Sequence, residues 1–373
     1  PPEIQLCYHC HCEIMGAEGY HEKKRSVGIL GATGLVGQRF IQRLNGHPWF
    51  TVQVVAASAK SAGVAYGDIV QWKLDSKIPE GVAALTVRSC SVEEFDGVDI
   101  IFSALDSAVA GNIEERFAAA GFAVFTNAGN HRMDARVPIL IPLINPDHIH
   151  AVKLQQRDRK TKGFIVSNAN CSSTGLSIAL KPLQDAFGIE SVFLVTLQAI
   201  SGAGYPGVSA LDIVDNVIPL ITGEESKLEL EPLKILGTWD TVDESFKFAQ
   251  FTLSAQCNRV AVRDGHMACC SVKLKSPANI SEIESVLSQY QPSIVKLELP
   301  SAPDRAIIIS EKLDRPQPRL DRDAGDGFSV TVGRIRSCSL FDVKFVCLSH
   351  NTVIGAAGGS IMNAELAVHY GYA

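Results

Sequence analysis

The chain has 373 residues, a formal net charge of −6, 46% hydrophobic residues and 20% charged residues. This composition is ordinary for a globular protein, and the length allows two domains with separate cores. The acidic balance excludes a general nucleic-acid binder, because phosphate backbones require clustered lysines and arginines. No apolar run approaches the ~20 residues of a membrane-spanning helix, and no signal-peptide pattern opens the chain, so we expect no membrane partner.

Residues 1–25 differ from the rest of the chain. The sequence CYHCHC at 7–12 gathers three cysteines and two histidines, ligands that zinc and copper use, but no second Cys/His pair follows at finger-like spacing. We interpret this segment as a disordered extension and predict no metal site, and the alternative that it binds zinc or copper stays open. The other cysteines are scattered through apolar segments of a chain that needs no disulfide framework, which indicates a reducing, cytoplasmic setting.

Strands and helices alternate from Ser26 onward. Helical spacing covers 34–44 and 110–121, and a glycine ends the second helix. Apolar segments predict strands over 26–30, 50–58, 98–105, 122–129 and 163–166. Strands that alternate with helices imply right-handed crossovers, so we predict an α/β fold with an N-terminal doubly wound parallel sheet of the Rossmann-like type.

A glycine-rich loop, within VGILGATGLVGQRF (27–40), lies between the first strand and the first helix. Small residues let the backbone turn tightly and approach a pyrophosphate, which rests on the N-terminus of the helix. The strand before the loop and the helix after it are the context that dinucleotide binding requires. We therefore predict cofactor contacts from Gly31, Ala32, Thr33, Gly34, Leu35, Val36 and Gly37.

The end of the second strand bears on which dinucleotide binds. A carboxylate there would bind a free ribose 2′-hydroxyl and repel a 2′-phosphate. The sequence AASAKSAG (56–63) has no acid and offers Ser58, Lys60 and Ser61. This favours NADP(H) over NAD, and the alternative that Lys60 is only a solvated loop lysine stays open.

The sequence SNANCSSTGL (167–176) places Cys171 between a buried strand and the start of a helix that continues to Phe187. The N–H groups and the dipole of a helix start stabilise a thiolate, so Cys171 is either a packed small residue or a nucleophile. A nucleophilic cysteine needs a group that manages protons. His266 is the natural candidate, because the unperturbed pKa of histidine lies near neutrality, and Arg259 lies seven residues before it.

The segments beyond Cys171 are longer and partly alternating in polarity. They predict strands over 191–201, 251–262, 266–275, 328–337 and 341–349. We therefore expect a second, α+β domain with a largely antiparallel sheet. A final helix over 360–371 follows GAAGG and is expected to pack back on the first domain.

Several motifs taken together resemble the aspartate-semialdehyde dehydrogenase family. They are SNANCSSTGL, QAISGAGYPGV (198–208), CNRVAVRDGH (257–266) and HNTVIGAAGGSIMNAE (350–365). The sequence RPQPRLDRDAG (315–325) makes the chain similar to the archaeal and fungal branch of that family. The resemblance runs from about Val27 to the last helix.

The resemblance implies an enzyme of two domains. An NADP-binding domain would cover 26–168 and be completed by 350–373, and a catalytic and dimerisation domain would cover 169–349, in a homodimer or a homotetramer. The implied reaction is the NADPH-dependent reductive dephosphorylation of L-aspartyl 4-phosphate to L-aspartate 4-semialdehyde. It proceeds through a cysteine acyl-thioester and belongs to the aspartate pathway to lysine, threonine and methionine.

The resemblance also implies roles for individual residues. Cys171 matches the nucleophile, His266 the acid/base, and Gln198 a glutamine that orients the reacting centre. Arg259 matches the group that binds the substrate α-carboxylate, in a bidentate geometry that lysine cannot copy. The other implied contacts are Glu224 with the substrate amine, Lys227 and Arg132 with phosphate, Asn170 beside the nucleophile, Asn351 near the nicotinamide, and Ser201 and Gly202 near the cofactor phosphates.

Two other functions stay open on the sequence alone. A malonyl-CoA-type acyl-CoA reductase shares the cysteine and the fold, although Glu224 and Arg259 favour an amino-acid substrate over a coenzyme A thioester. The second alternative is a catalytically silent NADP-binding homologue. The presence of Cys171, His266 and Arg259 argues against a silent protein.

Overall fold

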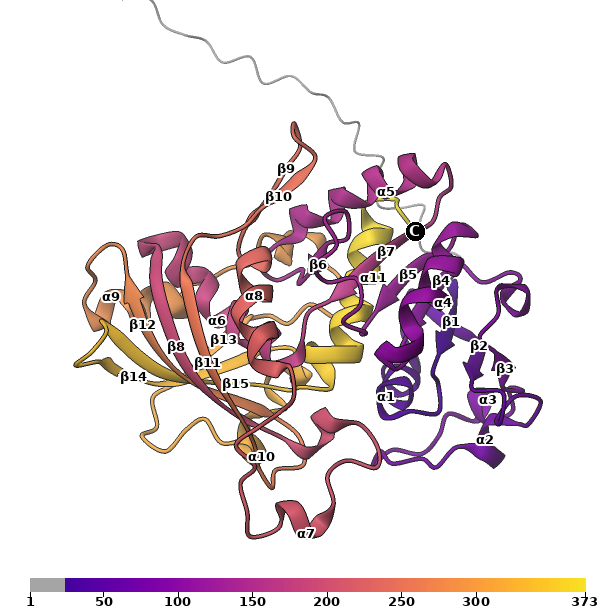
Figure 1. Ribbon diagram of the computed structural model, residues 1–373, viewed down its shortest axis with the longest axis horizontal. Helices are drawn as coiled ribbons and strands as arrows, with labels where there is room; N and C mark the ends of the chain where they lie inside the picture. The colour runs from indigo at the N-terminus through magenta and orange to yellow at the C-terminus, as the bar shows by residue number, and fades with distance from the viewer. Residues whose placement is uncertain (1–23) are drawn as a thin grey trace, which may run out of the picture.

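The computed structural model describes residues 24–373. The expected disordered extension and the CYHCHC segment lie outside the described residues, except that Arg25 already belongs to the first strand. Figure 1 shows two sheets side by side, one from the indigo and purple N-terminal half and one largely from orange and yellow segments. Among residues 24–373, no helix combines the length and the apolar character that a membrane crossing requires.

The first sheet confirms the predicted parallel arrangement. Its seven strands all pair in parallel, in the order β3-β2-β1-β4-β5-β7-β6. They are β1 (Arg25–Leu30), β2 (Phe50–Ala57), β3 (Arg88–Ser89), β4 (Ile100–Ser103), β5 (Ala123–Thr126), β6 (Ile139–Leu140) and β7 (Phe164–Asn168). β4, β5 and β7 are buried along their whole length, as expected of parallel strands that are covered on both faces. The two-residue strands β3 and β6 were not predicted.

Five α-helices belong to the part of the described chain that forms this sheet. They are α1 (Leu35–Leu44), α2 (Tyr66–Ile69), α3 (Glu80–Ala83), α4 (Ser107–Ala119) and α5 (Val152–Arg159). The helix predicted over 110–121 begins earlier, at Ser107, because the Asp106 carboxylate accepts a hydrogen bond from the N–H of Ala108 at 2.8 Å. The strand predicted over 98–105 is correspondingly shorter.

The second sheet is mixed, with the order β11-β8-β12-β15-β14-β13. Three of its five pairings are antiparallel, as predicted, and the β11–β8 and β13–β14 pairings at its edges are parallel. Its strands are β8 (Ile189–Gln198), β11 (Thr252–Arg259), β12 (His266–Leu274), β13 (Ile307–Ser310), β14 (Val330–Ser337) and β15 (Val343–Ser349). The chain between β8 and β11 crosses over through α8 (Glu224–Ile235), which packs on β11 and makes that pair parallel.

Helices α6 (Cys171–Phe187), α8 and α9 (Ile280–Ser288) pack against this second sheet. The chain also forms two short helices, α7 (Ala210–Ile213) and α10 (Pro318–Asp321), and a hairpin of β9 (Thr238–Asp240) and β10 (Ser245–Lys247). Along β8 and β12, buried residues alternate with residues that are half-buried or exposed, and the exposed ones include Phe193 and Cys269. The face that carries these two side chains therefore lies away from the helices.

The C-terminal helix α11 (Gly358–His369) returns the chain to the first sheet. It packs against α1, β4, β5 and β7, and Figure 1 shows this yellow helix beside the purple strands. A turn of π-helix over Val353–Ala357 leads into it from β15. The predicted final helix, 360–371, therefore exists and begins two residues earlier.

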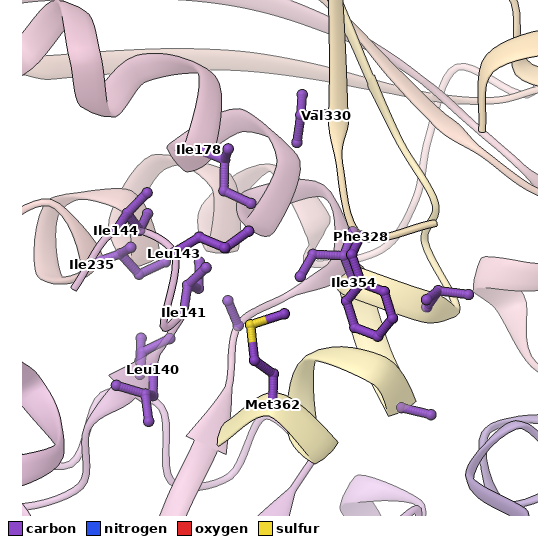
Figure 2. Packing of buried hydrophobic residues seen from close by; sticks show 14 of the residues in the cluster. Leu140, Ile141, Leu143, Ile144, Ile178, Ile235, Phe328, Val330, Ile354 and Met362 are labelled. Atoms are coloured by element: carbon purple, nitrogen blue, oxygen red, sulfur yellow. The ribbon is translucent and has the colours of Figure 1, made fainter. Parts of the chain in front are cut away.

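Hydrophobic residues from both halves of the chain share one large core, so the two halves do not have fully separate cores, and a second, smaller cluster around Phe95 and Phe117 belongs to the N-terminal half alone. Figure 2 shows side chains from β6 and the loop after it, from α6 and α8, from β14 and the turn before it, and from the C-terminal segment packed together. Those labelled there are Leu140, Ile141, Leu143, Ile144, Ile178, Ile235, Phe328, Val330, Ile354 and Met362. Because α6 lies within this core, the residues at its N-terminus are held in a fixed position relative to both sheets.

Candidate active site

The glycine loop is a close-packed backbone turn between β1 and α1. Gly31 has a φ of +76°, and a Cβ on it would lie 2.6 Å from the Ala104 carbonyl oxygen. A Cβ on Gly37 would lie 2.3 Å from the Gly31 carbonyl oxygen, so only glycine fits at either position. The predicted residues Gly31, Ala32, Thr33, Gly34, Leu35, Val36 and Gly37 all lie in this turn or in the first residues of α1.

The start of α1 suits an anion. Its N-cap is Gly34, which has no side chain to occupy the first N–H groups of the helix. Gln38 supports the loop from inside, because its side-chain amide donates to the carbonyls of Thr33 (2.9 Å) and Gln71 (3.1 Å). Sequence reasoning missed Gln38, whose contact with Gln71 joins segments that are 33 residues apart.

The residues predicted to bind the 2′-phosphate lie beyond the end of β2, the strand next to β1. Ser58 and Lys60 are exposed there, and the N–H of Ser61 donates to the Ser58 carbonyl across a turn. The structure thus places them on the N-terminal sheet beside the glycine loop, and they make no contact with the cysteine site described below.

Cys171 is the first residue of α6. The N-cap residue Asn170 accepts hydrogen bonds from the N–H groups of Ser172 and Ser173 on its side-chain oxygen, at 2.9 and 3.2 Å. The π-helical turn passes over the cysteine, since a Cβ on Gly355 would lie 3.0 Å from the Cys171 Cβ. Sequence reasoning placed Cys171 correctly at the helix start but did not single out Gly355.

The environment of Cys171 raises the pKa of its thiol to about 12. Burial is the largest cause, and the Glu224 carboxylate adds to it, whereas Arg132, Arg259 and the N–H of Ser172 lower the pKa. The helix start therefore acts in the expected direction, but burial outweighs it. No motif in the sequence indicates how deeply Cys171 is buried.

His266 begins β12 and is buried. Its Nδ1 accepts a hydrogen bond from the N–H of Ala199 at 3.0 Å, so the neutral ring carries its proton on Nε2. Within residues 24–373, Nε2 has no hydrogen-bond partner. Burial, followed by the charges of Arg259 and His350, lowers the pKa of His266 to about 3, in contrast to the near-neutral value on which the prediction was based.

Gln198 and Arg259 are paired residues at the ends of the parallel strands β8 and β11. Both are buried, and the Arg259 Nη1 donates to the Ala199 carbonyl at 2.7 Å. A Cβ on Gly202 would lie 2.9 Å from both the Arg259 Nη1 and the His266 Nε2, so this glycine lies directly against the two groups. The structure therefore gathers Gly202, Arg259 and His266 at one place.

Asn351 connects the loop of Ser201 to the start of β12. Its amide donates to the Ser201 hydroxyl at 2.8 Å, and its oxygen accepts from the N–H of Gly265 at 2.8 Å. The three residues predicted near the cofactor in the second half of the chain, Ser201, Gly202 and Asn351, therefore lie beside His266.

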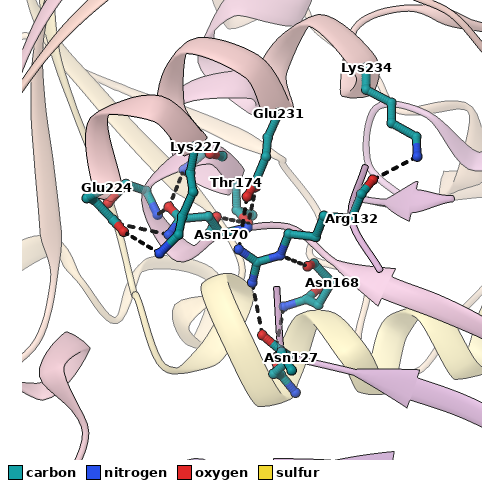
Figure 3. A network of polar contacts seen from close by, with 12 residues as sticks. Asn127, Arg132, Asn168, Asn170, Thr174, Glu224, Lys227, Glu231 and Lys234 are labelled. Carbon is teal, nitrogen blue, oxygen red and sulfur yellow. Dashed lines mark hydrogen bonds and ion pairs between the residues drawn. The ribbon is translucent and has the colours of Figure 1, made fainter. Parts of the chain in front are cut away.

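One face of α8 brings charged residues to the N-terminus of α6. The Glu224 carboxylate accepts from the Asn170 amide at 2.9 Å and pairs with Lys227 at 3.3 Å. Glu231 accepts from the N–H of Asn170 at 2.7 Å and pairs with Arg132 at 2.9 Å. Figure 3 shows these groups converging on Asn170.

The structure brings most predicted site residues together around Cys171. Four cationic side chains (Arg132, Lys227, Lys234 and Arg259) and two carboxylates (Glu224 and Glu231) lie in this region, so it favours anions. The sequence did not point to Glu231 or Lys234. Charges on a helix ordinarily face water, and only the fold reveals that these two are buried.

Comparison with known proteins matches both halves of the chain to family models. Residues 26–152 match the semialdehyde dehydrogenase NAD binding domain, and residues 180–354 match the semialdehyde dehydrogenase dimerisation domain.

Three similar proteins are aspartate-semialdehyde dehydrogenases. The chain is 48% identical over 354 residues to the aspartate-semialdehyde dehydrogenase of Cryptococcus neoformans, with 92% of this chain and 97% of that protein covered. It is 46% identical over 343 residues to that of Archaeoglobus fulgidus, with coverage of 92% and 98%. Among solved structures, the aspartate semialdehyde dehydrogenase of Candida albicans with NADP matches with a TM-score of 0.87 and 44% identity, over 94% of this chain and 100% of that one.

Proposed function

The chain belongs to the aspartate-semialdehyde dehydrogenase family, and we propose that it reduces L-aspartyl 4-phosphate with NADPH to L-aspartate 4-semialdehyde and phosphate. It is thus an NADP-dependent, phosphorylating aldehyde dehydrogenase of amino-acid biosynthesis, on the way to lysine, threonine and methionine. The observation that carries the proposal is the position of Cys171, at a capped helix start within a cluster of cations.

The residues of the N-terminal sheet fit NADP(H). The glycine loop leaves no room for a Cβ at Gly37 and presents the start of α1 to a pyrophosphate. Ser58, Lys60 and Ser61 would hold the 2′-phosphate, and Ser201, Gly202 and Asn351 would lie near the phosphates and the nicotinamide. When bound, the nicotinamide exchanges a hydride with the carbonyl carbon of the substrate.

Cys171 is the proposed nucleophile. In the direction of aldehyde oxidation, the thiol gives up its proton to water and its sulfur adds to the aldehyde carbon, which leaves a negative charge on the oxygen. The carbon then gives up a hydride as the C=O bond forms again, and a thioester results. A phosphate oxygen then attacks the thioester carbon and releases the Cys171 sulfur. Because burial raises the pKa of the thiol, the positive charges of Arg132 and Arg259 are needed to favour the thiolate as it forms.

His266, for which the resemblance implies an acid/base role, is proposed here to serve the substrate oxygen as a hydrogen-bond donor, and Gln198 is the proposed orienting group. Nε2 is the ring nitrogen that is free to meet the substrate oxygen, because Nδ1 is occupied by the N–H of Ala199. In the neutral form that this site favours, Nε2–H donates a hydrogen bond to that oxygen and stabilises its developing negative charge.

The charged residues are proposed to hold the two ends of the substrate. Arg259, at the end of β11, would bind the α-carboxylate with its guanidinium fork, and Glu224 would bind the amine. Arg132 and Lys227 would bind the phosphate, and Asn170 would hold the helix start beside the reacting carbon.

We propose the predicted division of the chain into an NADP-binding domain (26–168 with 350–373) and a catalytic and dimerisation domain (169–349). The contacts of α11 with β4, β5 and β7 support it. A homodimer or homotetramer is supported by the exposed Phe193 and Cys269 on the sheet of the second domain. The seven cysteines of residues 24–373 are free, which supports a cytoplasmic setting.

The experiment that tests this function is the reduction of NADP with L-aspartate 4-semialdehyde, with and without phosphate, run beside malonate semialdehyde with coenzyme A. We expect turnover that requires both phosphate and the amino-acid aldehyde. Turnover only with coenzyme A would support the acyl-CoA reductase alternative and contradict the roles of Arg132, Glu224 and Lys227. No turnover with either substrate, despite tight NADPH binding, would support the alternative of a catalytically silent NADP-binding homologue.

A further inference from the structure

The buried face of α8 holds two charged residues to which the proposed reaction gives no role. Charged residues at 224, 227, 231 and 234 are spaced by three or four and therefore share one face of the helix. Glu231 and Lys234 have exposed fractions of only 2% and 1%. Burying a charge is costly unless it is paired, so these two residues must make contacts that offset the cost.

Glu231 joins the Arg132 guanidinium to the start of the Cys171 helix. Its Oε1 accepts from the Arg132 Nη1 at 2.9 Å, and its Oε2 accepts from the N–H of Asn170 at 2.7 Å (Figure 3). A carboxylate so close to an anion site repels the anion. The contacts by which Glu231 orients Arg132 and Asn170 must therefore outweigh this repulsion.

Lys234 fixes the turn that carries Arg132. Its ammonium group donates to the carbonyl oxygens of Arg132, Asp134 and Val137, each at 2.7 Å, so all three of its protons have acceptors. The same ammonium lies 4.6 Å from the centre of the Phe246 ring. Lys234 is therefore held in one position, and it holds three backbone groups of the turn.

The Arg132 guanidinium is fixed on three sides. Besides the bond to Glu231, its Nε donates to the Asn168 carbonyl at 3.0 Å and its Nη2 donates to the Asn127 carbonyl at 2.9 Å. A guanidinium has five N–H groups, so one remains on each terminal nitrogen. These two N–H groups are left to bind an anion.

We propose that Glu231 and Lys234 are positioning residues of the phosphate subsite, which hold the Arg132 side chain and its turn in the orientation that binds the anion. This inference rests on the proposed function, because it takes Arg132 as a phosphate contact. The wild-type enzyme tests that function first: if its turnover of L-aspartate 4-semialdehyde does not require phosphate, the proposed function fails before any variant is made.

The decisive variant is Glu231→Gln, measured as the KM for phosphate. Glutamine keeps an oxygen for the N–H of Asn170 but loses the charge that pairs with Arg132. If Glu231 positions Arg132, the KM for phosphate rises, by roughly tenfold for the loss of one charge-assisted hydrogen bond. If Glu231 only adds negative charge to the site, the KM for phosphate falls. A lower or unchanged KM with a functional wild type overturns the inference.

The second variant is Lys234→Met, with Lys247→Met as the matched control on the exposed hairpin, where Lys247 pairs with Asp243. Lys234→Met should raise the KM for phosphate by roughly tenfold or more. The phosphate-independent burst of NADPH reports thioester formation at Cys171. It should fall by a smaller factor than the KM for phosphate rises, because Arg132 also favours the thiolate through its charge, which depends less on orientation than its hydrogen bonds to phosphate do. General damage to the fold does not produce this split. Equal losses in both readouts would show that Lys234 only stabilises the fold. If Lys234→Met does not fold, Glu231→Gln decides.

Discussion

The glycine loop and the Cys171 cluster are built in different ways. The loop consists of backbone, and the space at Gly31 and Gly37 is closed by main-chain atoms of the loop itself and of Ala104. The Cys171 cluster consists of side chains that come from α6, α8, β8, β11, β12 and the turn of Arg132. A backbone site is thus sensitive to added volume, whereas a side-chain site is sensitive to the loss of a charge or of a hydrogen bond.

The largest effect is expected from Cys171→Ala. Without the sulfur no thioester can form, so turnover and the NADPH burst should both disappear, while NADPH should still bind because the glycine loop is untouched. Activity assays and a binding titration check this. Cys270→Ala, which removes a buried cysteine of β12, is the control and should keep its activity. Substantial turnover by Cys171→Ala would rule out the thioester mechanism.

The next effect is expected from His266→Asn, which should lower kcat by roughly 10²–10⁴. The pKa of His266 lies at about 3, so this residue does not titrate near pH 6.5 in the folded protein. The pH profiles of the wild type and the variant should therefore have the same shape around pH 6.5. An effect below about threefold would give His266 a structural role only.

His266 also links stability to pH. The unfolded chain protonates this histidine below its ordinary pKa of about 6.5, whereas the folded chain does so only near 3. The histidine therefore contributes stability that is present above pH 6.5 and lost as the pH falls toward 3. Denaturant titrations of wild type and His266→Asn should show a smaller acid loss in the variant.

The sequence allowed the loop to be predicted more fully than the cluster. The glycines of 27–40 are local, and the strand and helix on either side of them follow from periodicity, so the parallel sheet was predicted as well. In the cluster, the resemblance to a family supplied residues such as Arg132 and Glu224, whose neighbours in space lie far away in the chain.

Three features of the structure were beyond sequence reasoning for a physical reason. The pKa shifts of Cys171 and His266 arise mainly from burial, which is a property of the folded chain. The parallel β11–β8 edge depends on the crossover through α8. Glu231 and Lys234 look like solvated helix charges until the Arg132 turn is seen to cover them.

Gly37→Ala tests the backbone side of the comparison. The added Cβ would lie 2.3 Å from the Gly31 carbonyl oxygen and 2.7 Å from the Ala32 Cα, so the loop must shift. A strain of about 1–3 kcal/mol predicts a KM for NADP that is roughly 5- to 150-fold higher, with the reactivity of Cys171 toward an alkylating reagent unchanged. Gly34→Ala should lose less, since its Cβ meets only the Gly31 carbonyl at 3.5 Å. Equal effects at the two positions would contradict the close-packed loop.

The smallest effect is expected from Glu224→Gln, measured as the pH dependence of Cys171 alkylation. The Glu224 carboxylate raises the pKa of the thiol, so the amide should lower that pKa and speed alkylation at a fixed alkaline pH. The pKa should nevertheless stay above that of an ordinary thiol, because burial is the larger cause. Glu225→Gln is the control, since Glu225 accepts from the N–H of Cys257 instead. Slower alkylation in Glu224→Gln, but not in Glu225→Gln, would mean that the Glu224 carboxylate mainly holds Asn170 and the helix start in place. In this cluster, the loss of a hydrogen bond would then outweigh the loss of a charge.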